Sequence, residues 1–79
     1  MPRYFLHLRD QLSETIDEEG KEMPPEAVAR TALLAARDCM AGDVKDGRLD
    51  LRYRIDVHDH RSKLVHSLPF ADALVITTA

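Results

Sequence analysis

Apolar and charged residues alternate along residues 3–9, and this period of two predicts a β-strand. One face of that strand would carry Tyr4, Leu6 and Leu8, and the other would carry Arg3, Phe5, His7 and Arg9. We expect a second, short strand around residues 14–16, followed by the acidic turn "DEEG". Gly20 suits this turn because glycine tolerates a positive φ.

The segment "MPPEAVARTALLAARDCMAG" predicts a helix over roughly residues 25–41. Pro25 is tolerated in a first turn, Glu26 complements the positive end of the helix dipole, and Gly42 can take the left-handed conformation that ends a helix. At about 100° per residue, the apolar arc contains Val28, Ala29, Ala32, Leu33, Ala35, Ala36, Cys39 and Met40. The opposite arc contains Glu26, Arg30, Arg37 and Asp38, with Leu34 among these charges. Because the alanines let the helix lie close to a sheet, we expect it to cover one sheet face.

A second alternating segment predicts a half-buried strand in the last third of the chain. There Leu51, Tyr53, Ile55 and Val57 alternate with Arg52, Arg54, Asp56 and His58. A turn near His60 and Arg61 would return the chain. With residue 58 paired to 63, Val57 would lie opposite Leu64, Ile55 opposite His66, Tyr53 opposite Leu68 and Leu51 opposite Phe70. Pro69 has no N–H to donate and ends this strand, which leaves residues 71–79 as a short helical turn or a loosely held tail.

These elements predict an α+β fold with the order β-β-α-β-β. A right-handed crossover from the second strand, over the first, to the third gives a four-stranded antiparallel sheet of order 2-1-3-4, with one helix packed on one face. A chain of 79 residues forms a single small domain, residues 1–79, with a modest core.

Composition narrows the choice of partners. The formal net charge of −3 disfavours generic binding to nucleic acid or to an anionic membrane, and half of the acidic residues fall within residues 10–26. No segment approaches the roughly 18 apolar residues of a membrane span, and the first ten residues lack the apolar run of a signal peptide. Cys39 is the single cysteine, so no internal disulfide can form and we expect a cytoplasmic protein.

Several stretches carry a resemblance to a known family: "MPRYFLHLRD", "IDEEG", the alanine-rich helix, "RIDVHD" and "SLPFADAL". Together they resemble a family of short, uncharacterised bacterial proteins known only as a domain of unknown function, and the likeness covers nearly the whole chain. The resemblance implies no activity. In that family the turn between the last two strands carries an acid and a glycine, where this chain has His60, Arg61 and Ser62. The order of elements is also similar, on topology alone, to the antitoxin half of certain bacterial toxin–antitoxin pairs.

The stretch "IDVHDHRSKLVHS" places three histidines beside two aspartates and raises the question of a metal site. Zinc ligands must converge to within about 2.1 Å of one ion. The expected pairing instead puts His58 on the polar face, His60 in the turn and His66 on the apolar face. Cys39 lies on the apolar arc of the helix, where burial raises the pKa of a thiol. With no phosphate loop, zinc-protease motif or calcium loop, we expect no catalytic residue, no metal, no cofactor and no enzyme.

The candidate interaction surface is the sheet face turned away from the helix. Its residues are Arg3, Phe5, His7, Arg9, Arg52, Arg54, His58 and Lys63, to which the helix adds Leu34. We expect a small non-catalytic interaction domain that binds another protein or forms a homodimer, in which the basic face or an open strand edge meets the acidic 10–26 segment of a second copy. The alternative is a nucleic-acid-binding or antitoxin-like regulator, in which Phe5 stacks on a base and the arginines follow the phosphates.

Overall fold

The first strand forms where the alternation predicts it. The computed structural model describes residues 1–78, and strand β1 spans Arg3–Arg9. Tyr4 is buried, and Leu6 and Leu8 pack partly against the core, so the predicted apolar face is confirmed. β1 is a central strand because other strands pair with both of its edges.

Two very short strands share one edge of β1. The predicted second strand is β2, Glu14–Thr15, which pairs with the end of β1, and β3, Lys21–Glu22, which was not predicted, pairs with its start. Residues 16–20 arch between them. At Gly20 φ is +71°, and a Cβ would lie 2.8 Å from Cε1 of Phe5, so both the backbone conformation and the space require glycine.

The helix is longer than predicted. It begins with a 3-10 turn, η1, at Pro25–Ala27, and continues as α1, Val28–Lys45. The prediction that Gly42 ends it is wrong: Gly42 stays helical, and Gly47, with φ +84°, supplies the left-handed residue after the last turn. Its buried residues are Val28, Ala32, Ala36 and Met40. Ala29, in the first turn, is exposed, so the apolar arc is narrower there than predicted.

The last hairpin pairs β4, Arg54–His58, with β5, Leu64–Pro69. The predicted register is wrong. Val57 lies opposite His66 and Ile55 opposite Leu68, with a β-bulge between Val57 and His58. Over most of the hairpin the observed pairing differs from the predicted pairing by two residues, so His66 and Leu68 still lie on the predicted face of the sheet. Beyond the bulge the shift is one residue, and Leu64 pairs with His58 on the opposite face.

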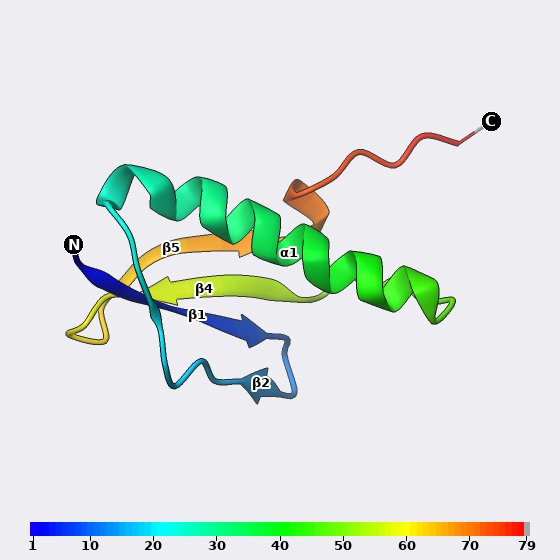
Figure 1. Ribbon diagram of the computed structural model, residues 1–79. Helices are drawn as coiled ribbons and strands as arrows, with labels where there is room; N and C mark the ends of the chain where they lie inside the picture. The colour runs from blue at the N-terminus through cyan, green and yellow to red at the C-terminus, as the bar shows by residue number, and fades with distance from the viewer. Residues whose placement is uncertain (79) are drawn as a thin grey trace.

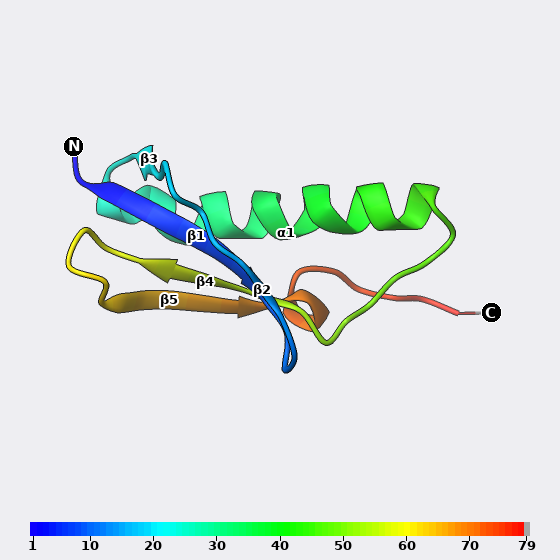
Figure 2. The ribbon, with the colours of Figure 1, turned by 90° about the horizontal axis from the view of Figure 1, so that it is seen from below.

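The architecture is α+β, as predicted, with α1 covering one face of an antiparallel sheet (Figures 1 and 2). The strand order β2-β1-β4-β5 corresponds to the predicted 2-1-3-4, and β3 adds a fifth strand beside β1. The most deeply buried large side chains are Val57 and Phe70, and Phe70 belongs to a 3-10 turn, η2, at Phe70–Asp72. Of the segment predicted as a turn or tail, Ala73 is buried, Val75 is exposed, and residue 79 lies outside the described residues. Within residues 1–78, no helix has both the length and the hydropathy needed to cross a membrane.

Candidate functional site

Strands β1 and β4 bring five of the predicted surface residues together on the outer sheet face, the face away from α1. Three cross-strand pairs form this surface: Phe5 with His58, His7 with Asp56, and Arg9 with Arg54. Residues that are distant in sequence therefore meet because the two strands are antiparallel neighbours.

A buried carboxylate binds the two arginines of this face. Asp56 is only 3% exposed and accepts hydrogen bonds from Arg9 Nη1 (3.2 Å), Arg54 Nε (3.0 Å) and Ser67 Oγ (2.6 Å). Burial alone would raise the pKa of Asp56, but the bonds from Ser67 and Arg54 outweigh it and lower this pKa. The carboxylate of Asp56 therefore compensates much of the positive charge that Arg9 and Arg54 bring to this face.

The remaining predicted cations are spread around the molecule. Arg3 pairs with Glu22 at 3.3 Å, and Arg9 Nε lies 2.9 Å from Glu14, so strand β1 already meets the acidic 10–26 segment of its own chain. Arg52 lies in a turn before β4, and its hydrogen bonds lower the pKa of Asp50 to about 2. Lys63 is exposed after the β4–β5 turn. Leu34, on α1, lies on the other side of the molecule.

His7 is buried although it belongs to the outer face. It is 9% exposed, because the arch of residues 16–20 covers it, and its Nδ1 accepts the backbone N–H of Asp17 at 3.0 Å. The Asp17 carboxylate in turn accepts the N–H groups of Leu6 and Gly20. Burial and the neighbouring His58, whose ring centroid lies 5.0 Å away, hold the pKa of His7 below its ordinary value. His7 is therefore neutral in neutral solution.

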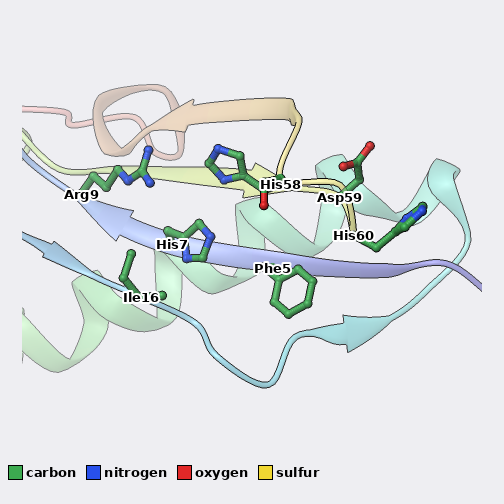
Figure 3. Close-up of a pocket in the computed structure, with 8 residues that line it drawn as sticks. Phe5, His7, Arg9, Ile16, His58, Asp59 and His60 are labelled. Atoms are coloured by element: carbon green, nitrogen blue, oxygen red, sulfur yellow. The ribbon is translucent and has the colours of Figure 1, made fainter.

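A shallow cavity of about 400 Å³ opens beside His7, and we call it the histidine pocket (Figure 3). Its lining residues are Phe5, His7, Arg9, Ile16, His58, Asp59, His60 and Ser62. The strands supply four of them, the arch supplies Ile16, and the β4–β5 turn supplies Asp59, His60 and Ser62. Nδ1 of His58 is buried and has no hydrogen-bond partner among the described residues.

The histidines do not converge on one point. His66 pairs with Val57 on the inner face, whereas His58 lies on the outer face, as the sequence predicted. Among residues 1–78, no group of three or more histidine, cysteine, aspartate or glutamate side chains is placed to hold a metal ion. Burial, Asp43 and Asp38 raise the pKa of the Cys39 thiol, which disfavours the reactive thiolate.

A second surface lies on the helix side, near the C-terminal half of α1. Arg37 Nε donates to the carbonyl oxygen of Ala73 at 2.8 Å and so fixes the segment after β5 against the helix. Beside this bond lies an apolar groove of about 250 Å³. We call two sets of apolar residues the helix–tail patch: the groove residues Met40, Ala41, Val44, Leu49 and Leu74, and the exposed residues Leu34 of α1 and Val75 and Ile76 of the tail. Val44 is 58% exposed and Ile76 is 57% exposed, so much of this apolar surface faces solvent.

A family model described as a domain of unknown function, DUF6894, matches residues 3–71 of the chain. The chain belongs to this family. The match confirms the resemblance noted in the sequence, and the family description states no activity. No curated protein and no solved structure matches the chain.

Sequence reasoning placed Phe5, His7, Arg9 and His58 of this DUF6894 domain on one surface, and the structure brings all four to the histidine pocket. It missed Asp17, whose position in an acidic turn gave no sign that its carboxylate binds the backbone of β1. The burial of Asp56 was also missed. The alternation of β4 correctly assigned Asp56 to the outer face, but no local pattern indicates that two arginines and a serine enclose it.

Proposed function

We propose that this DUF6894 chain is a small non-catalytic interaction domain that pairs with a second copy of itself through the helix–tail patch. The observation that carries the proposal is the apolar surface of Leu34, Val44, Leu49, Val75 and Ile76, all exposed on a chain with a modest core. Exposed apolar surface around a groove is typical of interaction sites on small proteins.

The charges around the patch favour a second copy as the partner. Arg37 and Lys45 lie on the same solvent-facing part of α1 as Asp38, and Asp46 follows directly. If all charges around the patch had the same sign, two copies would repel each other. Because both signs are present, a positive residue of one copy can pair with a negative residue of the other across a two-fold axis.

The sheet edges are poorer candidates for self-association. β5 is the outermost strand on one side, but the hairpin bulge leaves Val65 out of the ladder and Pro69 ends the strand, and both features oppose pairing with another chain. On the other side, the acidic segment already pairs with Arg3 and Arg9 of its own chain. We therefore propose the helix–tail patch in place of the basic face as the surface of contact.

Light scattering after size-exclusion chromatography tests the proposal with two matched variants. Val44→Glu places a charge in the patch, and Val65→Glu places the same charge on a valine of similar exposure (44%) at the far sheet edge. At tens of micromolar, we expect a dimer for the unmodified chain and for Val65→Glu, and a monomer for Val44→Glu. High salt should leave the dimer intact because burial of apolar surface is not screened.

The outcomes separate the possible modes of association. A dimer that is lost in Val65→Glu and kept in Val44→Glu would point to the β5 edge, and a dimer dissociated by salt would point to the charged surfaces. A monomeric mass at every concentration and salt would refute self-association altogether.

The alternative function is a nucleic-acid-binding or antitoxin-like regulator. Its support is the β4–β5 turn, where His60, Arg61 and Lys63 are exposed near Phe5 of the histidine pocket. Such a surface could follow phosphates while Phe5 stacks on a base. Fluorescence anisotropy with labelled single-stranded oligonucleotides at low salt tests it. Binding that is weakened by Lys63→Glu would support the alternative, and no binding would eliminate it.

We also propose a cytoplasmic setting, for which the support is that Cys39, the single cysteine, is a free thiol. Fractionation of cells producing the tagged chain would test this proposal, and recovery from an oxidising compartment would refute it.

A further inference from the structure

His7 presents one ring nitrogen to the protein and leaves the other for the histidine pocket. Because Nδ1 accepts the N–H of Asp17, the ring hydrogen of the neutral imidazole is on Nε2. This tautomer is assigned from that hydrogen bond. No described group of the chain accepts a hydrogen bond from Nε2, although the residue is only 9% exposed. Nε2 is also not among the buried atoms that lack a partner, so it is open to the pocket, where its N–H is free to donate to a ligand.

Two further ring or guanidinium nitrogens of the pocket lack a hydrogen-bond partner, and the one carboxylate among its lining residues is occupied. Arg9 Nε is buried without a well-formed hydrogen bond even though Glu14 lies 2.9 Å away, and His58 Nδ1 is buried without a partner. The carboxylate of Asp59 is directed to its own turn, where it accepts the N–H groups of Arg61 (2.8 Å) and Lys63 (3.0 Å). The pocket therefore offers the Nε2–H donor of His7 to an acceptor atom of a ligand, with no free carboxylate of Asp59 to compete for it.

The pocket also has two apolar lining residues, Phe5 and Ile16. The ring of Phe5 packs against Gly20, where even a methyl group would come within 2.8 Å of Cε1, and this contact fixes the ring beside the cavity. Ile16, on the arch, lines the same cavity (Figure 3). Its volume of about 400 Å³ is in the range of small-molecule sites, which combine apolar walls with a few fixed polar groups.

We propose that the histidine pocket binds a small planar anion, whose flat ring lies against Phe5 and Ile16 while a carboxylate or phosphate oxygen accepts a hydrogen bond from Nε2 of His7. An anionic oxygen accepts stronger hydrogen bonds than a neutral carbonyl oxygen, which suits the Nε2–H donor of His7. This site is on the outer sheet face and is independent of self-association through the helix–tail patch.

Nitrogen-15 NMR of the histidine side chains tests the proposal on the full chain, with benzoate and phenyl phosphate as probes. We expect saturable shifts of the His7 and His58 ring signals at probe concentrations up to about 10 mM. The ring of His66, on the other sheet face, is an internal control and should not shift. Uncharged benzamide, which has the same ring, should bind about tenfold more weakly than benzoate. Binding of one anion alone would tell whether the natural ligand carries a carboxylate or a phosphate.

His7→Asn separates the role of His7 in binding from its role in the fold. The asparagine oxygen can replace Nδ1 as the acceptor for Asp17, but the variant lacks the Nε2–H donor. We expect its affinity for benzoate or phenyl phosphate to fall about tenfold. His66→Asn makes the same change on the other face and should leave the affinity unchanged.

Three results would overturn the proposal: no saturable shift with either anion, equal binding of benzamide, or unchanged affinity in a folded His7→Asn variant. If His7→Asn does not fold, Phe5→Leu replaces the aromatic ring by an aliphatic side chain. Affinity for both anions that is unchanged in Phe5→Leu would equally overturn it.

Discussion

Replacing Asp17 by alanine should destabilise the fold far more than an exposed turn aspartate normally does. The Asp17 carboxylate accepts the backbone N–H groups of Leu6 (3.1 Å), Glu19 (3.2 Å) and Gly20 (3.0 Å). Leu6 has no strand partner on this edge of β1, because it lies between the parts that pair with β2 and β3. The carboxylate of Asp17 accepts the Leu6 N–H in place of such a partner, and it also holds the arch that covers His7.

The expected cost follows from the burial of each donor. The N–H of Glu19 is exposed, so water can replace the carboxylate there at little cost. The N–H groups of Leu6 and Gly20 are partly buried, and leaving such a donor unsatisfied costs about 1–3 kcal/mol. Because both donors are only partly buried, the lower part of this range applies to each of them. Asp17→Ala should therefore lower the free energy of unfolding by about 2–4 kcal/mol, a large share of the total of about 5 kcal/mol for a small domain.

Urea unfolding followed by circular dichroism measures this change, with Asp10→Ala as the matched control. Asp10 also accepts two backbone N–H groups, from Leu12 and Ser13, but in an exposed turn, so its loss should cost less than about 1 kcal/mol. A free energy of unfolding for Asp17→Ala that is within about 0.5 kcal/mol of the unmodified chain, or equal to that of Asp10→Ala, would refute the reasoning.

Three further predictions test other parts of the structure. Burial and His58 lower the pKa of His7, so the unfolded chain protonates this histidine at a higher pH than the folded chain does. The free energy of unfolding should therefore fall as the pH drops below about 6.5. In His7→Asn, the melting temperature should change less between about pH 7 and pH 5 than in the unmodified chain. In urea unfolding, Ile55→Ala should cost about 2–4 kcal/mol because Ile55 is buried. Arg54→Ala should cost about 1 kcal/mol because the carboxylate of Asp56 keeps its other donors, Arg9 and Ser67. Equal costs would mean that the faces of β4 are reversed. Because His58 and His66 lie on opposite faces, modest excess zinc should leave the melting temperature unchanged, and a saturable rise that disappears in His58→Ala would contradict this.

The candidate site was predictable as far as it depends on strand periodicity. The alternation of β1 places Phe5, His7 and Arg9 on one face, and antiparallel pairing with β4 adds His58. The burial of His7 was not predictable, because it depends on a backbone contact with a residue ten positions later in an irregular arch. Hydrogen bonds of this kind follow no repeat in the sequence and leave no local signal.

The alternation of β1 and β4 and the apolar arc of α1 determined the α+β class and the face covered by the helix, because these depend on side-chain periodicity. The strand order of the main sheet followed from the order of the elements and the right-handed crossover. The end of the helix, the hairpin register and the pairing of the arginines were decided by tertiary structure. Gly42 and Gly47 both suit a helix end, and only the folded chain selects Gly47. The register depends on the bulge beside His58, and the charge of the outer face depends on Asp56, which two arginines from different strands enclose. Contacts between distant segments set these features, and local composition does not encode which acid meets which base.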